Sequence, residues 1–124
     1  TAVGKTKTPP VDGEPLDSLT FAVFSCANYN EGYFHAYDVA STIQGLDFWF
    51  HAGDYIYAYA DTDCEGDRCW EPKKEAVELD DYRQRYASYH LDEGLQNLRR
   101  SAALISTWDD HETANNSAGR ERKK

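Results

Sequence analysis

Three short stretches of the chain are dominated by apolar residues and predict buried β-strands. They are LTFAVFSC (residues 19–26), LDFWFHAGD (46–54) and SAALIST (101–107). β-Branched and aromatic residues favour strands, and runs of this length that end in small or polar residues are typical of buried strands. The second run stops at Gly53, where the backbone can turn sharply.

Between the first two runs, apolar positions recur at helical spacing. Residues 30–44 place Phe34, Tyr37 and Ile43 on one side of a helix. Gly45 follows directly, and glycine is the residue most often found just past the end of a helix. The spacing therefore predicts one helix that ends before Gly45.

Residues 76–100 predict two further helices. Tyr82, Tyr86 and Tyr89 stand at i, i+4 and i+7, and a second, shorter helix is expected to begin at Asp92. The resulting order is strand, helix, strand, two helices, strand. This order is typical of an α/β fold with layers around a largely parallel sheet.

Composition and charge narrow the class of protein. The chain has 124 residues, which is at most one domain, and 40% of them are hydrophobic, as in a globular protein. The formal net charge of −9 argues against a nucleic-acid-binding surface, because phosphate backbones require a basic one. An excess of acidic residues is compatible with metal binding, although such residues more often form a solvent-exposed face with no ligand. No run of about 18 apolar residues is present, so no transmembrane segment is expected.

The first 18 residues and the last six residues differ in composition from the rest of the chain. Residues 1–18 contain three prolines, two glycines and no apolar period, and we interpret them as a linker or lead-in segment. No charged-then-apolar leader is present, so any export signal is expected to have been removed or never included. The last six residues, GRERKK, are polar and basic, and they show no pattern typical of the end of a domain. The chain is therefore expected to be cut from a longer domain.

The three cysteines favour one disulfide. Cys64 and Cys69 lie close together in the polar loop DTDCEGDRCWEP, whereas Cys26 ends an apolar run and has no obvious partner. One pair and one single thiol indicate an oxidising compartment in which Cys26 has another role. The alternative is three inert thiols in a cytosolic protein.

Side chains able to bind a metal follow each predicted strand. The segments are SCANYN, HAGDYIY and WDDHETANN. In open α/β sheets, ligands bind outside the carboxyl ends of the strands, so these segments converge if the strands are neighbours. The candidates are Cys26, Asp54, Tyr57, Asp109, Asp110, His111, Glu112 and Asn116. Their convergence predicts a metal site more strongly than any single motif does.

Each candidate also has an ordinary interpretation. Cys26 can be a small buried apolar residue, and Asp54 after a glycine can be a turn residue. Tyr57 can serve packing, although a phenolate is also a hard anionic ligand for a ferric ion. The acidic residues of WDDHE can favour a helix N-terminus, a role compatible with metal binding.

The segments FAVFSCANYNEGYFHAY, DFWFHAGDYIYAY, DDYRQRYASYHLDEGLQNLR and ALISTWDDHETANN resemble the PhoD family of alkaline phosphatases and phosphodiesterases, in register and in order over residues 19–117. Members are similar to calcineurin-like metallophosphatases. The resemblance implies a four-layer α-β-β-α sandwich of two β-sheets flanked by helices. Residues 19–124 would form the N-terminal portion of that catalytic domain, with the C-terminal half absent. It also implies a periplasmic or secreted protein, exported in folded form by the twin-arginine route.

The resemblance implies a role for each candidate ligand. Cys26 would match a cysteine ligand to iron (Fe3+), Asp54 an aspartate that bridges iron and calcium (Ca2+), and Tyr57 a tyrosinate on iron. Asp109 and Asn116 would match calcium ligands.

The same resemblance assigns the catalytic pair. Asp110 and His111 occupy a position that reads Asn-His in wider metallophosphatases, where the histidine contacts the phosphate or the leaving group. One departure is Ala58, which stands where the family usually has a glutamate. We assign no ligand role at that position, so the expected centre is unaffected.

The resemblance predicts metal-assisted hydrolysis of a phosphomonoester or phosphodiester. Bound cations would supply the positive charge that the acidic chain lacks. A rival interpretation is a non-catalytic secreted calcium-binding module, which would need neither Cys26 nor Tyr57. With ligands missing from the second half of the domain, this chain alone is expected to be inactive.

Overall fold

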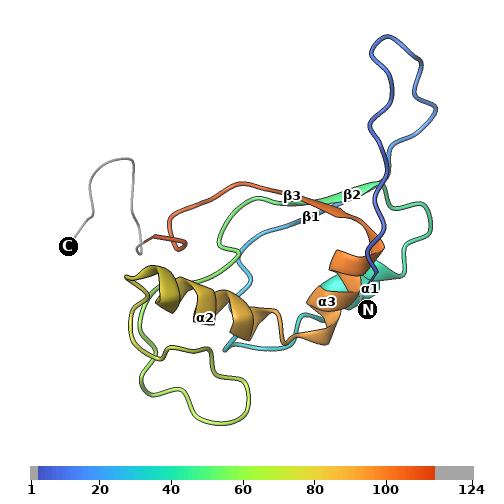
Figure 1. Ribbon diagram of the computed structural model, residues 1–124. Coiled ribbons are helices and arrows are strands. Elements are labelled where there is room, and N and C mark those ends of the chain that lie inside the picture. The colour runs from blue at the N-terminus through green and yellow to red at the C-terminus, as the bar shows by residue number, and fades with distance from the viewer. Residues whose placement is uncertain (1–2, 114–124) are drawn as a thin grey trace.

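The computed structural model describes residues 3–113 and contains a three-stranded parallel sheet. The strands are β1 (Phe21–Phe24), β2 (Phe48–His51) and β3 (Ala103–Ser106), in the order β1-β2-β3. The helices are α1 (His35–Ser41), α2 (Leu79–Tyr89) and α3 (Glu93–Ser101). Figure 1 shows these helices on one side of the sheet, with the carboxyl ends of the strands above α2. The predicted α/β order and the parallel sheet are confirmed.

The helices begin where carboxylates accept free backbone amides. Asp92 caps α3 by accepting a hydrogen bond from the Leu95 amide at 3.0 Å, so the predicted second helix is confirmed. The same carboxylate accepts the Phe34 amide at 3.2 Å, just before α1 begins. Helix α1 is shorter than the predicted 30–44, because residues 29–31 form a turn and Phe34 is held by Asp92.

The sheet has one covered face and one open face. Parallel registry places Trp49 and His51 toward the helices, and both are fully buried. On the opposite face, Phe21, Val23 and Ile105 are about half exposed, at 51%, 57% and 50%. The prediction of buried strands is therefore correct for one face only. No described element packs over the other face, which leaves it open (Figure 1).

Phe48, Trp49 and Phe50 show how the two faces of the sheet differ. If both faces lacked a second layer, all three aromatic side chains would be under-covered. Trp49 instead lies in the aromatic core beside Tyr37 and Phe24, with no exposed surface. Phe48 and Phe50 are partly exposed, and Phe48 stacks on Phe21 with 5.1 Å between ring centroids. Strand alternation explains the difference, since Trp49 points to the helices and its neighbours point away.

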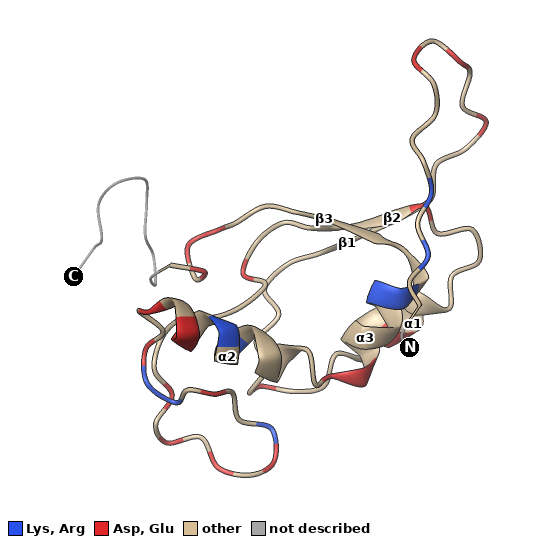
Figure 2. Cartoon of the chain, viewed as in Figure 1, with Lys and Arg blue, Asp and Glu red and all other residues tan. Residues whose placement is uncertain are grey.

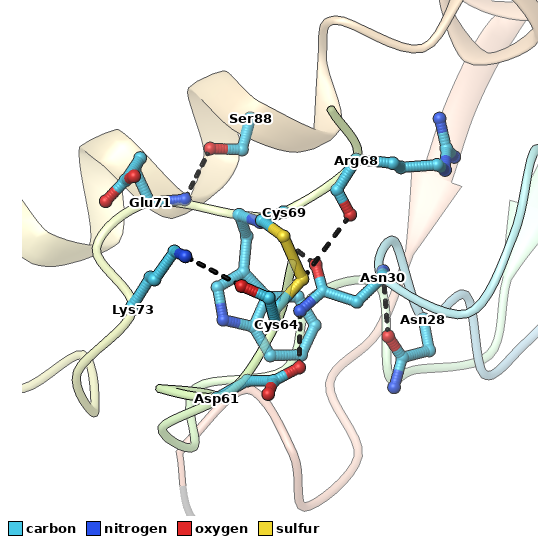
Figure 3. Close-up of a disulfide and its surroundings, with 10 residues drawn as sticks. Asn28, Asn30, Asp61, Cys64, Arg68, Cys69, Glu71, Lys73 and Ser88 are labelled. Carbon is cyan, nitrogen blue, oxygen red and sulfur yellow. Dashed lines mark hydrogen bonds between the residues drawn. A yellow bond between two sulfur atoms is a disulfide. The ribbon is translucent and has the colours of Figure 1, made fainter. Parts of the chain in front are cut away.

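The loop before α2 is closed by the predicted disulfide between Cys64 and Cys69 (Figure 3). Asn30 donates to Asp61 at 2.6 Å and accepts the Trp70 amide at 2.9 Å, which ties the loop to the segment after β1. Further along, the Glu71 amide donates to the Ser88 hydroxyl of α2 at 2.8 Å. The loop thus joins the β1 segment to α2. Among the described residues, no helix is long and apolar enough to cross a membrane.

The disulfide predicts a difference in mass. Protein recovered from an oxidising compartment should have lost two hydrogens at Cys64 and Cys69, and reduction should restore them. Mass spectrometry of the peptide containing both residues measures this change. Free thiols at both positions in such protein would contradict the pairing.

His51 predicts a pH dependence of stability. Its Nδ1 accepts the Gly53 amide at 3.4 Å and its Nε2 lies 3.0 Å from the Tyr37 hydroxyl, which favours a neutral ring. Burial lowers the pKa of His51 from 6.5 to about 4, with Glu112 opposing the shift. Between pH 6.5 and about 4, the unfolded chain binds a proton at His51 that the folded chain does not. The free energy of unfolding therefore falls as the pH falls through this range, by roughly 3 kcal/mol.

Urea unfolding at several pH values from about 7 to about 4 measures this loss. Replacing His51 with Gln should flatten the dependence over that range, although it also lowers stability at neutral pH. An unchanged slope in the variant would assign the pH dependence to other groups.

Candidate metal centre

The paths of β1 and β2 stay side by side beyond the strands themselves. The Cys26 amide donates to the Gly53 carbonyl at 3.2 Å, and the Ala27 amide donates to the Asp54 carbonyl at 3.0 Å. This continued pairing brings the Cys26 Sγ to 3.5 Å from the Asp54 Oδ2. The expected convergence of these two strand ends is therefore present.

Cys26 and Asp54 both adopt an unusual backbone conformation. Their φ angles are +56° and +53°, in the left-handed region that residues other than glycine rarely occupy. Such conformations persist only where the surroundings enforce them, and they concentrate at functional sites. Cys26 is also exposed, which contradicts its interpretation as a buried apolar residue.

The segment after β3 is folded against this pair by Glu112. This buried carboxylate accepts the Tyr55 amide at 2.7 Å through Oε1 and the Asp109 amide at 3.0 Å through Oε2. In addition, the His111 amide donates to Asp54 Oδ1 at 3.2 Å, and the His111 carbonyl accepts the Ala58 amide at 2.9 Å. Residues 111–113 form a turn rather than a helix in the described chain. Within the described residues, the segment WDDHE is thus held in a turn by Glu112, and any continuation of it lies outside them.

Three side chains have the arrangement of a metal site. Asp54, Asp110 and His111 each present a ligand atom, and these atoms lie within 4.8 Å of one another. The Nδ1 of His111 is buried and has no hydrogen-bond partner among the described residues. Buried polar atoms are normally paired, so an orphaned imidazole nitrogen beside two carboxylates fits a cation.

Tyr57 points to the same carboxylate as Cys26. Its hydroxyl lies 3.5 Å from Asp54 Oδ2, and its ring packs on His111 with centroids 4.5 Å apart. Burial raises the pKa of Tyr57, and the nearby Asp54 and Cys26 raise it further. A tyrosinate at this position therefore requires a strong cationic partner.

Burial also raises the pKa of Asp54, although the hydrogen bond from the His111 amide opposes this effect. Asp54 is therefore the point at which the thiol, the phenol and the turn after β3 meet. Its two oxygens are used on different sides, Oδ1 by the turn and Oδ2 by Cys26 and Tyr57. Both oxygens of Asp54 therefore take part in the contacts of the candidate site.

The remaining predicted ligands lie differently. Asp109 is exposed, and it is Asp110 that joins the Asp54–His111 group within residues 3–113. Asp109 packs against Gly53, where an added Cβ would lie 2.5 Å from the Asp109 Cβ. Asn116 lies outside the described residues.

Comparisons with known proteins agree with these features. The family model described as PhoD-like phosphatase matches residues 21–124. The chain is 40% identical over 121 residues to alkaline phosphatase D of Bacillus subtilis (strain 168), covering 95% of this chain and 21% of that protein. A solved structure, "Structure of PhoD", matches with a TM-score of 0.87 and 39% identity over 98% of this chain and 24% of the other. The chain thus spans about a fifth to a quarter of the length of these relatives.

The close approach of Gly53 to Asp109 predicts an asymmetric effect of alanine substitution. Gly53 has φ +112° and an added Cβ would meet backbone and side-chain atoms of Asp109. Gly66 has a similar φ of +98° with no atom within 4 Å, so it reports backbone strain alone. Gly66→Ala should cost about 1 kcal/mol, and Gly53→Ala should cost several times more.

Urea unfolding of the two variants measures the difference, and limited proteolysis reports whether the segment after β3 is displaced in Gly53→Ala. Equal losses in the two variants would show that the turn yields to the added methyl group.

Proposed function

The chain belongs to the PhoD-like phosphatase family, and we propose that the protein hydrolyses phosphoesters at a metal centre on the carboxyl ends of β1 and β2. The observation that carries this proposal is the meeting of Cys26, Tyr57 and His111 at the two oxygens of Asp54. Phosphomonoesters and phosphodiesters are both candidate substrates. A nucleic-acid-binding surface is not part of the proposal, since the net charge is −9.

The donor set supports iron and calcium as the cations. Cys26, Asp54 and Tyr57 would hold Fe3+, because a thiolate and a phenolate are anionic donors suited to it. Asp54, Asp109 and Asn116 would provide the oxygen ligands that Ca2+ prefers. When bound, these ions lower the pKa of a coordinated water and neutralise charge on the phosphate.

Asp110 and His111 are the proposed catalytic residues. The main chain of His111 is fixed on both sides, by Asp54 and by the Ala58 amide, so its ring has a defined direction. The ring packs between Tyr57 and Tyr59, at 4.5 Å and 5.7 Å. An imidazole held in this way can donate a hydrogen bond to a phosphate oxygen or a proton to the leaving group. Asp110 lies close enough to stabilise the protonated ring.

The charge distribution supports a role for cations in substrate binding. Figure 2 marks acidic residues (red) on the segment after β3, at the start of α2 and along the disulfide loop. An anionic phosphoester would be repelled by such a surface unless bound cations reverse the local field.

The open sheet face supports the finer fold proposal. Its apolar side chains are Phe21, Val23, Phe48, Phe50, Ala103 and Ile105. A second β-sheet packed on this face would complete a four-layer α-β-β-α sandwich. In this proposal residues 19–124 form the N-terminal portion of the catalytic domain, and residues 1–18 are a linker. The disulfide supports a periplasmic or secreted location.

Tyr57 provides the direct test of the iron site. Replacing Tyr57 with Phe in the full-length protein should abolish a visible absorption band from tyrosinate-to-iron charge transfer, and should lower turnover by at least about tenfold. Tyr59→Phe is the matched control, because its hydroxyl accepts from Asn28 at 2.9 Å rather than approaching Asp54. The control should retain the band.

Absorption spectra and metal analysis of the three proteins measure these effects. An unchanged band in Tyr57→Phe would assign that residue to packing. Calcium without iron, together with no turnover, would favour the rival calcium-binding module.

A further inference from the structure

Arg85 of α2 is fully buried, and it forms no ion pair within residues 3–113. Its guanidinium instead donates to four main-chain carbonyls. Nη1 donates to the carbonyls of Tyr57 and Tyr59, and Nη2 donates to those of Pro72 at 2.6 Å and Lys74 at 3.0 Å. All four acceptors belong to irregular segments on either side of the disulfide loop.

Burying the Arg85 guanidinium without an anionic partner among the described residues lowers the free energy of unfolding. Burial lowers the pKa of Arg85, which reflects the penalty for removing a cation from water. The planar guanidinium holds its N–H donors in fixed directions, so it can bind several carbonyls at once. A lysine ammonium on its flexible stem does this less well. The guanidinium also stacks on the buried Trp70, with its carbon 4.5 Å from the ring centroid. The side chain is therefore held in a single direction.

Two side chains of helix α2 contact the main chain of Tyr57. Arg85 binds the Tyr57 carbonyl, and the Tyr57 amide faces the hydroxyl of the fully buried Tyr89, where it opposes the rise of the Tyr89 pKa that burial causes. Residues 85 and 89 are one helical turn apart, so they project from the same face of α2. The Tyr89 hydroxyl also accepts the Tyr29 amide at 3.3 Å, which ties the segment after β1 to the same point.

The direction of the Tyr57 side chain depends on these contacts, because residues 52–58 belong to no helix or strand. The neighbouring backbone groups are held elsewhere: the Tyr55 amide by Glu112 and the Ala58 amide by the His111 carbonyl. At Tyr57 itself, the carbonyl is bound by Arg85 and the amide faces the Tyr89 hydroxyl, and both side chains belong to α2. A shift of α2 would therefore move the phenol relative to Asp54.

We propose that Arg85 and Tyr89 are positioning residues that aim the Tyr57 phenol at the cation-binding side of Asp54. This inference rests on the proposed function, since it requires that Tyr57 binds the iron. Arg85 and Tyr89 touch neither the cation nor the substrate. They act through the main chain of Tyr57.

Substitution of residues that orient a metal ligand typically weakens metal binding by about 10-fold to 100-fold. In the full-length protein, Arg85→Lys should therefore weaken Fe3+ binding at least about tenfold. It should also lower the intensity, or shift the position, of the tyrosinate band per bound iron. Tyr89→Phe keeps the buried ring and removes the hydroxyl that faces the Tyr57 amide and accepts the Tyr29 amide. It should change the band in the same direction, at a smaller cost to folding than the loss of the buried guanidinium.

Arg83→Lys is the matched control. Arg83 lies on the same helix with a side chain that is 69% exposed, and it pairs only with the exposed Asp80 at 3.0 Å in the described chain. This variant should keep both the band and the iron affinity of the parent protein.

Three measurements on each protein separate positioning from general stability. They are the visible spectrum per bound iron, the Fe3+ affinity against a competing chelator, and the thermal unfolding midpoint. A merely structural role would lower the midpoint and leave the spectrum per bound iron of the folded protein unchanged, and this result would overturn the inference. If Arg85→Lys does not fold, Tyr89→Phe decides, and an unchanged band in it overturns the inference.

Failure of the proposed iron site gives a different result. In that case the parent protein and Tyr57→Phe have the same spectrum, and the inference falls together with the site. A parent band that Tyr57→Phe removes, but that Arg85→Lys and Tyr89→Phe leave intact, overturns the positioning role alone.

Discussion

The candidate centre depends on the parallel pairing of β1 with β2, which continues beyond both strands. Cys26 and Ala27 bind the carbonyls of Gly53 and Asp54, so a thiol and a carboxylate that are distant in sequence come within 3.5 Å. Cys26 and Asp54, the two residues with positive φ angles, both lie within this continued pairing. Tyr57 and the His111 amide both approach the carboxylate of Asp54, so their positions depend on this pair.

Two buried charged side chains attach the remaining segments to that pair. Glu112 binds the amides of Tyr55 and Asp109, and Arg85 binds carbonyls on both sides of the disulfide loop. Irregular segments have no strand partner to satisfy their backbone groups, so a charged side chain with several donors or acceptors can hold them in place. The centre is thus built from loops, but its loops are fixed by hydrogen bonds.

Local sequence patterns predicted the strands, the break between α2 and α3 at Asp92, and the disulfide, because each depends on neighbouring residues. The roles of Glu112 and Arg85 could not be predicted in this way. Arg85 stands among the tyrosines of α2 like any surface charge, and its burial depends on segments far away in sequence. Which of the two sheet faces stays open could not be predicted either, since an apolar run without alternation does not show which face will be covered.

The open face has a consequence for the order of folding. The three strands are adjacent in chain order, and the segments between them supply the helices that bury Trp49. The covered half of the sheet can therefore form from contacts within this segment, before anything packs on Phe21, Val23 and Ile105. During that interval an apolar strand surface faces water, where it can associate with other chains. In the proposed sandwich, the rate at which the second sheet packs on this face would determine how much of the protein reaches its native state.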